Sequence, residues 1–397
     1  MKNLPQSLIL NENTQNMKLI IHGQCVFIFK VLNNPQEIIF TLSNSDKTNN
    51  IFIKFSNKKV AVYNSNLNET YIDNNNVSGL IDNDDAIYWF SLDSQNQILR
   101  AGIGEARPDT IIYDYKFSYT FEDEDYEKNK IYIESFTNLT YHENILPVKL
   151  LRDPIVSKVP LKVKNTNQLT MNDVAENKYL PHSNLSQTAQ QLYECISGKK
   201  FILDDEDFPD FSKAIEYSIA TPGLWCHEKL KDKSTEFNPS TPTINETYLR
   251  ITLGKNSGES PGIPYVLEIW PSNHYSPIHS HASTDAIIRV LHGEINVKLF
   301  PFLSKKEIEP FGTQVFKKDE VTWISPELNQ VHQLINLNQD ATCITIQCYM
   351  YGEKNRIHYD YFDYISEDGQ LEQYEPDSDK DFVDFKLLMK KEWSEKP

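Results

Sequence analysis

The chain has 397 residues, of which 39% are hydrophobic and 12% aromatic, so it can form two or three domains with apolar cores. Asp and Glu (56) outnumber Lys and Arg (39), and the formal net charge of −17 argues against nucleic-acid binding and against anionic membrane surfaces. No apolar run approaches the length of a membrane span, and the N-terminal segment does not have the pattern of a secretory signal. We therefore expect a soluble protein with no nucleic-acid partner and no membrane partner.

Cysteine usage indicates the compartment. The number of cysteines is odd and their spacing matches no disulfide framework, which favours a reducing environment. The sequence therefore predicts a cytoplasmic protein. The five are Cys25, Cys195, Cys226, Cys343 and Cys348.

Residues 1–155 carry a strand pattern. From about Val26 to Leu150, short β-branched and aromatic runs alternate with clusters of Asn, Asp, Ser and Lys, which predicts an antiparallel sandwich or barrel. The runs are CVFIFKVL, EIIFTLS, NIFIKFS, KVAVYN, AIYWFSLD, ILRAGIG, TIIYDYKFSYTF and KIYIESF (residues 130–136).

Within this region, YWFSLDSQNQILRAGIG (Tyr88–Gly104) resembles the tryptophan-strand-turn-strand-glycine portion of β-sandwich modules named after farnesoic acid O-methyltransferase. No glycine-rich loop stands between a strand and a helix to hold a cofactor, so we do not expect methyltransferase activity. The resemblance implies an accessory interaction or ligand-binding module, or a purely structural one. The ligand or protein partner of this domain is not identified by the sequence.

Residues 156–183 are rich in proline and polar residues without clear periodicity, which predicts a linker. Helical spacing follows, in SQTAQQLYECISG, with Ser186 as a candidate N-cap, and in FPDFSKAIEYSIAT (Phe208–Thr221). From Glu246 an alternating pattern returns and predicts six or more strands, enough for one barrel. After Asp360 the chain is acidic, which is typical of a solvated surface, and DFKLLMKKEW can form a closing helix.

The segment around His279 and His281 carries the chemistry. In an extended segment alternate side chains point to one side, so both imidazoles can reach one metal; two solvated histidines on a surface strand are the alternative. His332 lies in another strand-like segment, and two strands of a small barrel can bring it to the same cavity. Three neutral imidazoles suit a divalent first-row metal and leave positions open for substrate. Asp285 could complete a two-histidine, one-carboxylate site instead.

These residues resemble a known family. The HxH pair, a glycine about a dozen residues later, and then Pro326, His332 and Asn336 resemble the two motifs of cupins, which are double-stranded β-helix barrels. Beyond these motifs, residues 184–397 resemble cysteine dioxygenase, the three-histidine thiol dioxygenase of this superfamily. The further matches are the two helices before the barrel, Tyr248-Leu-Arg250, Trp270 nine residues before His279, and Tyr349 seventeen residues after His332.

The resemblance implies that His279, His281 and His332 bind Fe(II), with zinc binding or a structural role as alternatives. It implies that Arg250 holds the substrate carboxylate by a charge-assisted contact and that Tyr349 positions the thiolate and oxygen. An ion pair and simple packing are the respective alternatives. Tyr248 and Trp270 would line the substrate pocket. The implied reaction places both atoms of O2 on the sulfur of a small thiol and yields a sulfinic acid without an external reductant.

The chain departs from the family at three places, one of which is that Met350, Tyr351 and Gly352 stand where a proline pair usually follows the tyrosine. Ala286 stands where the animal enzymes have a cysteine crosslinked to the active-site tyrosine, so no such crosslink can form with Tyr349. Gln347 stands where the family usually has a histidine that hydrogen-bonds this tyrosine as part of a serine-histidine-tyrosine relay, and Thr345 can replace the serine. Gln347 can orient Tyr349 in the substrate-binding pocket, but it cannot titrate.

The sequence thus predicts a mainly β protein with an antiparallel sandwich, a linker, and a cupin barrel preceded by two or three short helices. Its predicted function is Fe(II)-dependent oxidation of a carboxylate-bearing thiol, with L-cysteine favoured. Oxidation of 3-mercaptopropionate is an alternative, because both thiols carry a carboxylate. A cupin that has lost catalysis and serves as a binding or structural module is a second alternative, and a zinc- or nickel-loaded cupin with other chemistry is a third.

Overall fold

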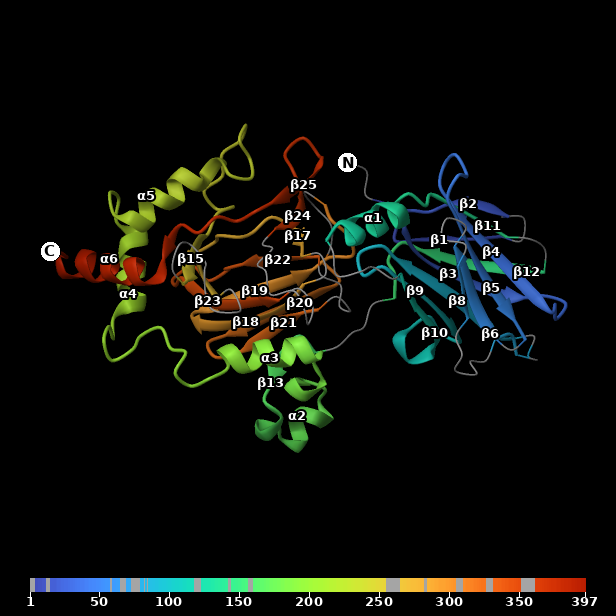
Figure 1. Cartoon of the computed structure of the whole chain (residues 1–397), viewed down its shortest axis with the longest axis horizontal. Coiled ribbons are helices and arrows are strands. Elements are labelled where there is room, and N and C mark those ends of the chain that lie inside the picture. The colour runs from blue at the N-terminus through green and yellow to red at the C-terminus, as the bar shows by residue number, and fades with distance from the viewer. Residues whose placement is uncertain are drawn as a thin grey trace. The chain divides into compact units, whose positions relative to one another are not determined.

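The computed structural model divides into two compact units, Met1–Lys158 and Val159–Pro397 (Figure 1). Within the described part of the chain, no helix is both long and apolar enough to cross a bilayer. The structure describes residues 4–11, 15–57, 59–72 without 65–68, 79–81, 83, 85–117, 123–141, 144–155, 160–254, 265–281, 284–304, 310–325, 331–350 and 361–397.

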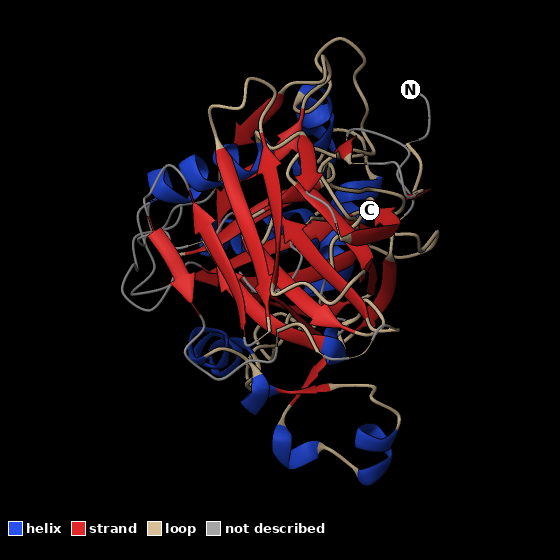
Figure 2. Cartoon of the chain, turned by 90° about the vertical axis from the view of Figure 1, so that its right-hand side faces the viewer, coloured by secondary structure: helices blue, strands red, loops and turns tan. Residues whose placement is uncertain are grey.

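The first unit is a sandwich of two six-stranded antiparallel sheets (Figure 2). One sheet has the order β1-β12-β3-β8-β9-β10, and the other has the order β2-β11-β4-β5-β6-β7. The first comprises β1 (Ser7–Ile9), β3 (Gln24–Val31), β8 (Ile87–Asp93), β9 (Ile98–Ile103), β10 (Ile111–Lys116) and β12 (Ile145–Leu151); the second comprises β2 (Asn16–Lys18), β4 (Glu37–Ser43), β5 (Asn50–Ser56), β6 (Lys59–Asn64), β7 (Glu69–Ile72) and β11 (Asn138–Tyr141).

Aromatic side chains fill the space between these sheets. Phe27 and Phe29 of β3 are completely buried, as is Phe40 of β4, and the rings of Phe29 and Phe40 have centroids 4.7 Å apart. Alternate residues of each strand supply this core, because side chains at i and i+2 share a face. The alternation in the sequence therefore predicted both the strands and the face that they bury.

One element of this unit differs from the prediction. The segment KIYIESF, predicted as a strand, mostly lies in helix α1 (Asp123–Glu134). The residues before it are mainly Glu, Asp and Lys, and Glu and Lys favour helices. Ile133 and Phe136 are buried while Ile131 is 63% exposed, so burial follows a spacing of three residues rather than two.

The second unit begins earlier than residue 184. Residues 160–183, within the segment predicted as a linker, contain β13 (Val163–Lys164), α2 (Met171–Ala175) and β14 (Leu180–Pro181). Strand β13 pairs with β21 (Val321–Ile324) through Val163, which joins this segment to the large sheet of the unit. Short 3-10 turns stand at Pro108–Thr110, Thr166–Gln168, His182–Asn184 and Lys233–Thr235.

Four helices share one apolar cluster with the large sheet. The two helices predicted before the barrel are present, and the side chain of Ser186 accepts a hydrogen bond from Ala189 N at 3.1 Å as the N-cap of the first. Leu192 and Ile196 of that helix, and Phe385 of the closing helix, share one buried cluster with the strands. The four are α3 (Gln187–Ile196), α4 (Phe211–Ala220), α5 (Trp225–Asp232) and α6 (Phe382–Ser394).

Two sheets form the body of the second unit. Their orders are β14-β13-β21-β18-β23-β16-β15-β26 and β20-β19-β22-β17-β24-β25, antiparallel except for the pairs β13–β14 and β15–β26. This confirms the predicted fold class, although the described strands form two separate sheets and not one closed barrel. The remaining strands are β15 (Leu249–Leu253), β16 (Tyr265–Trp270), β18 (Asp285–His292), β23 (Cys343–Met350) and β26 (Lys380–Asp381) in the large sheet, and β17 (His279–Ser280), β19 (Glu294–Leu299), β20 (Gly312–Lys317), β22 (His332–Ile335), β24 (Phe362–Ile365) and β25 (Leu371–Tyr374) in the small one.

The glycine of the predicted motif, Gly293, connects β18 to β19 and so joins the two sheets. Its φ is +70°, and a Cβ there would lie 2.5 Å from Thr342 O. We therefore expect Gly293→Ala to destabilise the second unit by about 2 kcal/mol or more. Chemical denaturation of the full chain, followed by tryptophan fluorescence, would measure this loss.

The matched control is Gly198→Ala. A Cβ at Gly198 meets no atom within 4 Å and its φ is not in the left-handed region. This variant should stay within about 0.5 kcal/mol of the wild type. Equal losses in the two variants would contradict the conformational explanation.

Candidate metal centre

The large sheet of the second unit is buried on both faces, and its strands therefore alternate between two environments. All eight residues of β23 are buried. Ile344, Ile346 and Cys348 belong to the cluster beneath the helices. The residues between them, Thr345, Gln347 and Tyr349, point the other way, towards the space between the sheets.

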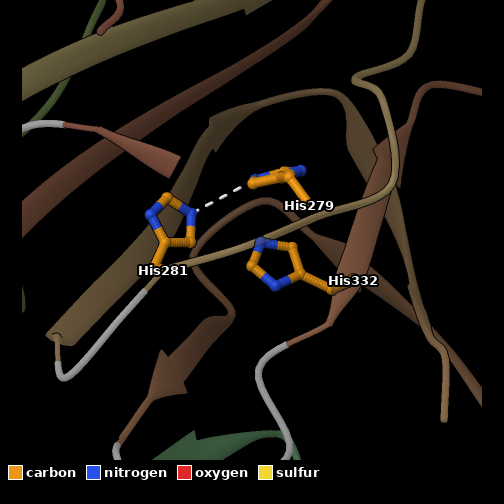
Figure 3. Close-up of side chains that lie close together, drawn as sticks. All are labelled: His279, His281 and His332. Atoms are coloured by element: carbon orange, nitrogen blue, oxygen red, sulfur yellow. Dashed lines mark hydrogen bonds between the residues drawn. The ribbon is translucent and has the colours of Figure 1, made fainter. Parts of the chain in front are cut away.

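Three histidines meet in that space. His279 of β17 stands directly opposite His332 of β22 in the small sheet, and His281 follows two residues later. Figure 3 shows the three imidazoles turned towards one another, with Nε2 of His279 3.1 Å from Nε2 of His281. One nitrogen from each ring can be chosen such that all three lie within 4.8 Å of one another.

The surroundings of His279 and His281 favour the neutral ring, the form that binds a metal. His279 Nδ1 donates to Pro277 O at 2.9 Å, which leaves the lone pair on Nε2. Burial, and then the neighbouring His332, hold the pKa of His279 well below its usual range. Burial, His279, His332 and Arg250 lower the pKa of His281 in the same way. Neutral imidazoles offer their lone pairs to a cation.

The donor geometry also fits a first-row metal ion. Two nitrogens about 2.1 Å from one ion, at octahedral or tetrahedral angles, lie roughly 3.0–3.4 Å apart, which brackets the observed 3.1 Å. Asp285 does not belong to this group, because its carboxylate accepts from Ser186 Oγ at 2.9 Å, on the helix side of the sheet. Its neighbour Ala286 faces inwards and packs with Tyr349. Among the described residues, the donor set is therefore three histidines.

A cavity beside the histidines brings together all the other predicted site residues. Arg250 of β15 is 2% exposed and donates through Nη1 to Pro376 O. Trp270 of β16 stacks on Tyr248, with ring centroids 4.3 Å apart. Trp270 Nε1 is buried and has no hydrogen-bond partner among the described residues. The cavity is lined by Tyr248, Arg250, Glu268, Trp270, Ser276, His279, His281, Ile288, His332, Leu334, Gln347, Tyr349, Phe362 and Pro376.

Gln347 links Tyr349 to a carboxylate that sequence reasoning missed. Tyr349 donates its hydroxyl hydrogen to Gln347 Oε1, and Gln347 Nε2 donates to Glu268 Oε2 and to Thr345 Oγ1, the latter at 3.3 Å. Glu268 is 7% exposed and lies opposite Arg250 across β15 and β16. The sequence could have indicated this residue, because Glu268 is the charged residue of the apolar strand YVLEIW and shares a face with Trp270.

The acidic C-terminal segment reaches this site. Asp379 lies within the segment predicted as a solvated surface, but its side chain is only 4% exposed. It accepts from Arg250 N at 2.7 Å and pairs with Lys233 at 3.2 Å. Asp379 thus holds the backbone of Arg250, and the Pro376 carbonyl holds its guanidinium group. The contact between Arg250 and Asp379 joins positions more than a hundred residues apart, so no local sequence pattern predicts it.

The motif residue Asn336 has a structural role in the described region. Its side-chain amide donates to Trp270 O at 2.9 Å and to Ala341 O at 2.8 Å, which ties β22 to the end of β16. Pro326, the other motif residue, lies outside the described residues.

No family model matches the sequence. The chain is similar to Caenorhabditis elegans galectin LEC-6 (8% identity, 37% of this chain and 94% of that chain, TM-score 0.27). It is also similar to the Cupin_2 domain of an XRE family transcriptional regulator from Enterobacter cloacae (12%, 27% and 98%, TM-score 0.21) and to the cupin domain of Schizosaccharomyces pombe Cnp3 (16%, 28% and 69%, TM-score 0.20). These TM-scores are too low to bear on function, which rests on the residues of the site.

We expect the wild-type chain to bind one divalent first-row metal ion, and the variants His279→Ala, His281→Ala and His332→Ala each to bind it at least about 100-fold more weakly. Anaerobic equilibrium dialysis with Fe(II) or Co(II), followed by metal analysis, measures this affinity. His292→Ala is the control, because His292 pairs with Glu216 at 3.1 Å and does not line the cavity. Wild-type affinity in all three variants would rule out this donor set.

Proposed function

We propose that the second unit is an Fe(II)-dependent thiol dioxygenase that oxidises a small carboxylate-bearing thiol, L-cysteine in first place, to its sulfinic acid. The observation that carries this proposal is the shared cavity of three buried histidines and a buried arginine. Neutral ligands leave the full charge of a bound Fe(II) to acidify a thiol, and the arginine selects a carboxylate. The first unit serves as an accessory module in this proposal.

Fe(II), held by His279, His281 and His332, would supply the positions at which thiolate and O2 meet. The overall change adds O2 to R–SH and gives R–SO2H, so atoms and electrons balance without a reductant. The sulfur is oxidised and the oxygen is reduced.

The remaining residues bind and orient the substrate. Arg250, fixed from behind by Pro376 O, would pair with the carboxylate and so set the position of the sulfur. The indole N–H of Trp270 would offer a donor to the bound molecule, since it lacks a partner among the described residues. Burial of all these groups excludes water from the reacting thiolate.

Purified chain loaded with Fe(II) should consume O2 with L-cysteine and release cysteine sulfinate. His332→Ala should do neither, because a site with two histidines loses its metal. An oxygen electrode and mass spectrometry of the product provide the two measurements. A wild-type protein that takes up no O2 with cysteine, 3-mercaptopropionate or cysteamine would disprove the proposed activity and favour a cupin that only binds.

Arg250→Gln tests the assigned carboxylate contact. We expect KM for cysteine and for 3-mercaptopropionate to rise about tenfold or more, the value of a charge-assisted hydrogen bond, and KM for cysteamine to stay within about threefold. Arg289→Gln is the matched control, because Arg289 lies on the other face of the sheet and bonds Ile196 O at 2.8 Å and Asp319 at 2.7 Å. If cysteamine is the best substrate of the wild type, Arg250 does not have this role.

A further inference from the structure

A second and larger cavity lies on the other face of the small sheet. Its volume is about 370 Å³, within the range of small-molecule sites, whereas the cavity beside the histidines has about 20 Å³. Gln333 lines the larger cavity, and His332, its neighbour in β22, lines the smaller one. Successive side chains of a strand point to opposite faces, so the sheet separates the two cavities.

Lys298 supplies the cation of the larger cavity. Val297 and Leu299, its neighbours in β19, are buried in one apolar cluster, so Lys298 points to the opposite face of the strand. Its cross-strand neighbours are Thr313 and Gln333, neither of which is acidic. Among the described residues the Lys298 ammonium has no ion pair and no hydrogen bond, although acidic residues outnumber basic ones in the chain. It is therefore available to an anion.

Gln333 supplies an acceptor of fixed direction. Its Nε2 donates to Ser276 O at 3.0 Å, and because a carbonyl only accepts, the amide cannot turn round without losing this bond. Ser276 is itself held, since its N–H donates to Leu334 O at 3.0 Å and its hydroxyl accepts from Leu334 N at 3.1 Å. Gln333 Oε1 has no partner within the described part of the chain.

The two polar groups are neighbours. Lys298 stands directly opposite Gln333 across β19 and β22, and the Cβ atoms of such a pair lie about 4.5–5.5 Å apart. The cavity thus offers a charged donor beside a neutral acceptor. One small molecule can satisfy both groups if it carries an anionic group with an O–H or N–H next to it.

Aromatic rings supply the apolar walls of the cavity. Phe237 and Phe300 are buried, and Tyr275 is half-buried with a hydroxyl that has no hydrogen-bond partner among the described residues. Glu246 also lines the cavity and accepts from Asn238 Nδ2. Lys298 is the only cationic side chain among the described residues of the lining. The rings favour a ligand with a flat or apolar body.

We propose that this cavity is a second binding site, for a small organic acid that has a hydroxyl or amine next to its carboxylate and an aromatic body. The carboxylate pairs with Lys298, the adjacent O–H or N–H donates to Gln333 Oε1, and the body packs against the rings. The site is independent of the proposed thiol oxidation, because none of its lining residues lines the cavity beside the histidines.

Four probes test the predicted chemistry, each titrated by ligand-observed NMR into the full chain with and without Co(II). We expect 3-phenyllactate to bind, 3-phenylpropionate, which lacks the hydroxyl, to bind about fivefold more weakly, and phenyllactamide, which lacks the charge, about tenfold or more weakly. Phenylalanine carries an ammonium group in place of the hydroxyl. The tighter of phenylalanine and 3-phenyllactate tells whether the natural ligand is an amino acid or a hydroxy acid.

Variants assign the contacts. Lys298→Met keeps the length of the side chain but removes its charge, and should weaken 3-phenyllactate about tenfold, whereas Lys298→Arg should stay within about threefold of the wild type. Gln333→Leu should bind 3-phenyllactate and 3-phenylpropionate equally. Lys317→Met is the matched control, because Lys317 is exposed at the end of β20 and does not line the cavity. Its affinity for 3-phenyllactate should equal that of the wild type.

The opposite results are equally definite. Unchanged affinity in Lys298→Met, or a wild type that binds none of the four probes, would overturn the site. If 3-phenyllactate binds only in the presence of Co(II), or if Arg250→Gln abolishes its binding and Lys298→Met does not, the acid occupies the cavity beside the histidines and the inference is wrong. Absence of O2 uptake with thiols would disprove the proposed oxidation and leave this second site standing.

Discussion

Burial of the large sheet on both faces is the constraint on which the second unit depends. Helices cover one face with a continuous apolar cluster, and the small sheet covers the other. A polar side chain that points into such a space must find a hydrogen-bond partner, since desolvation without one costs about 1–3 kcal/mol. The inward-facing polar groups of β15, β16 and β23 therefore occur together, as a connected group beside the three histidines. The site therefore occupies inward-facing strand positions at which most strands would carry apolar core residues.

Much of this was predictable because strands encode their faces locally. The shared side of His279 and His281 and the strands around them follow from a period of two, whereas Tyr349 was assigned from the family resemblance. The same rule misassigned residues 130–134, where a short apolar run fits a strand or a helix equally and only burial distinguishes them. Glu268 was missed for a different reason: it occupies no position that the family resemblance names, although its charge in an apolar strand marks it as unusual.

Other features could not be predicted because they are contacts between distant segments. The acidic stretch near the C-terminus has the composition of a solvated surface, yet the side chain of Asp379 is covered and contacts Lys233 and the backbone of Arg250. Likewise, residues 160–183 have no periodicity of their own, but they pair with the large sheet through β13. In both cases the segment is ordered by contacts with a distant part of the chain, and its own composition does not predict those contacts.

Gln347 gives the hydrogen bonds at Tyr349 a partner that cannot titrate. A histidine beside a tyrosine can donate or accept and can change its charge, so the polarity of its hydrogen bonds varies with pH and with the ligand. An amide has a fixed set of donors and acceptors, and only its orientation can vary. In the structure the amide nitrogen faces Glu268 and the amide oxygen faces Tyr349. A site with the amide in this orientation offers one arrangement of donors and acceptors, which favours one kind of ligand over several. Glu268 also lies opposite Arg250 across β15 and β16, so the residue that contacts the amide and the residue proposed to hold the substrate carboxylate are neighbours in the sheet.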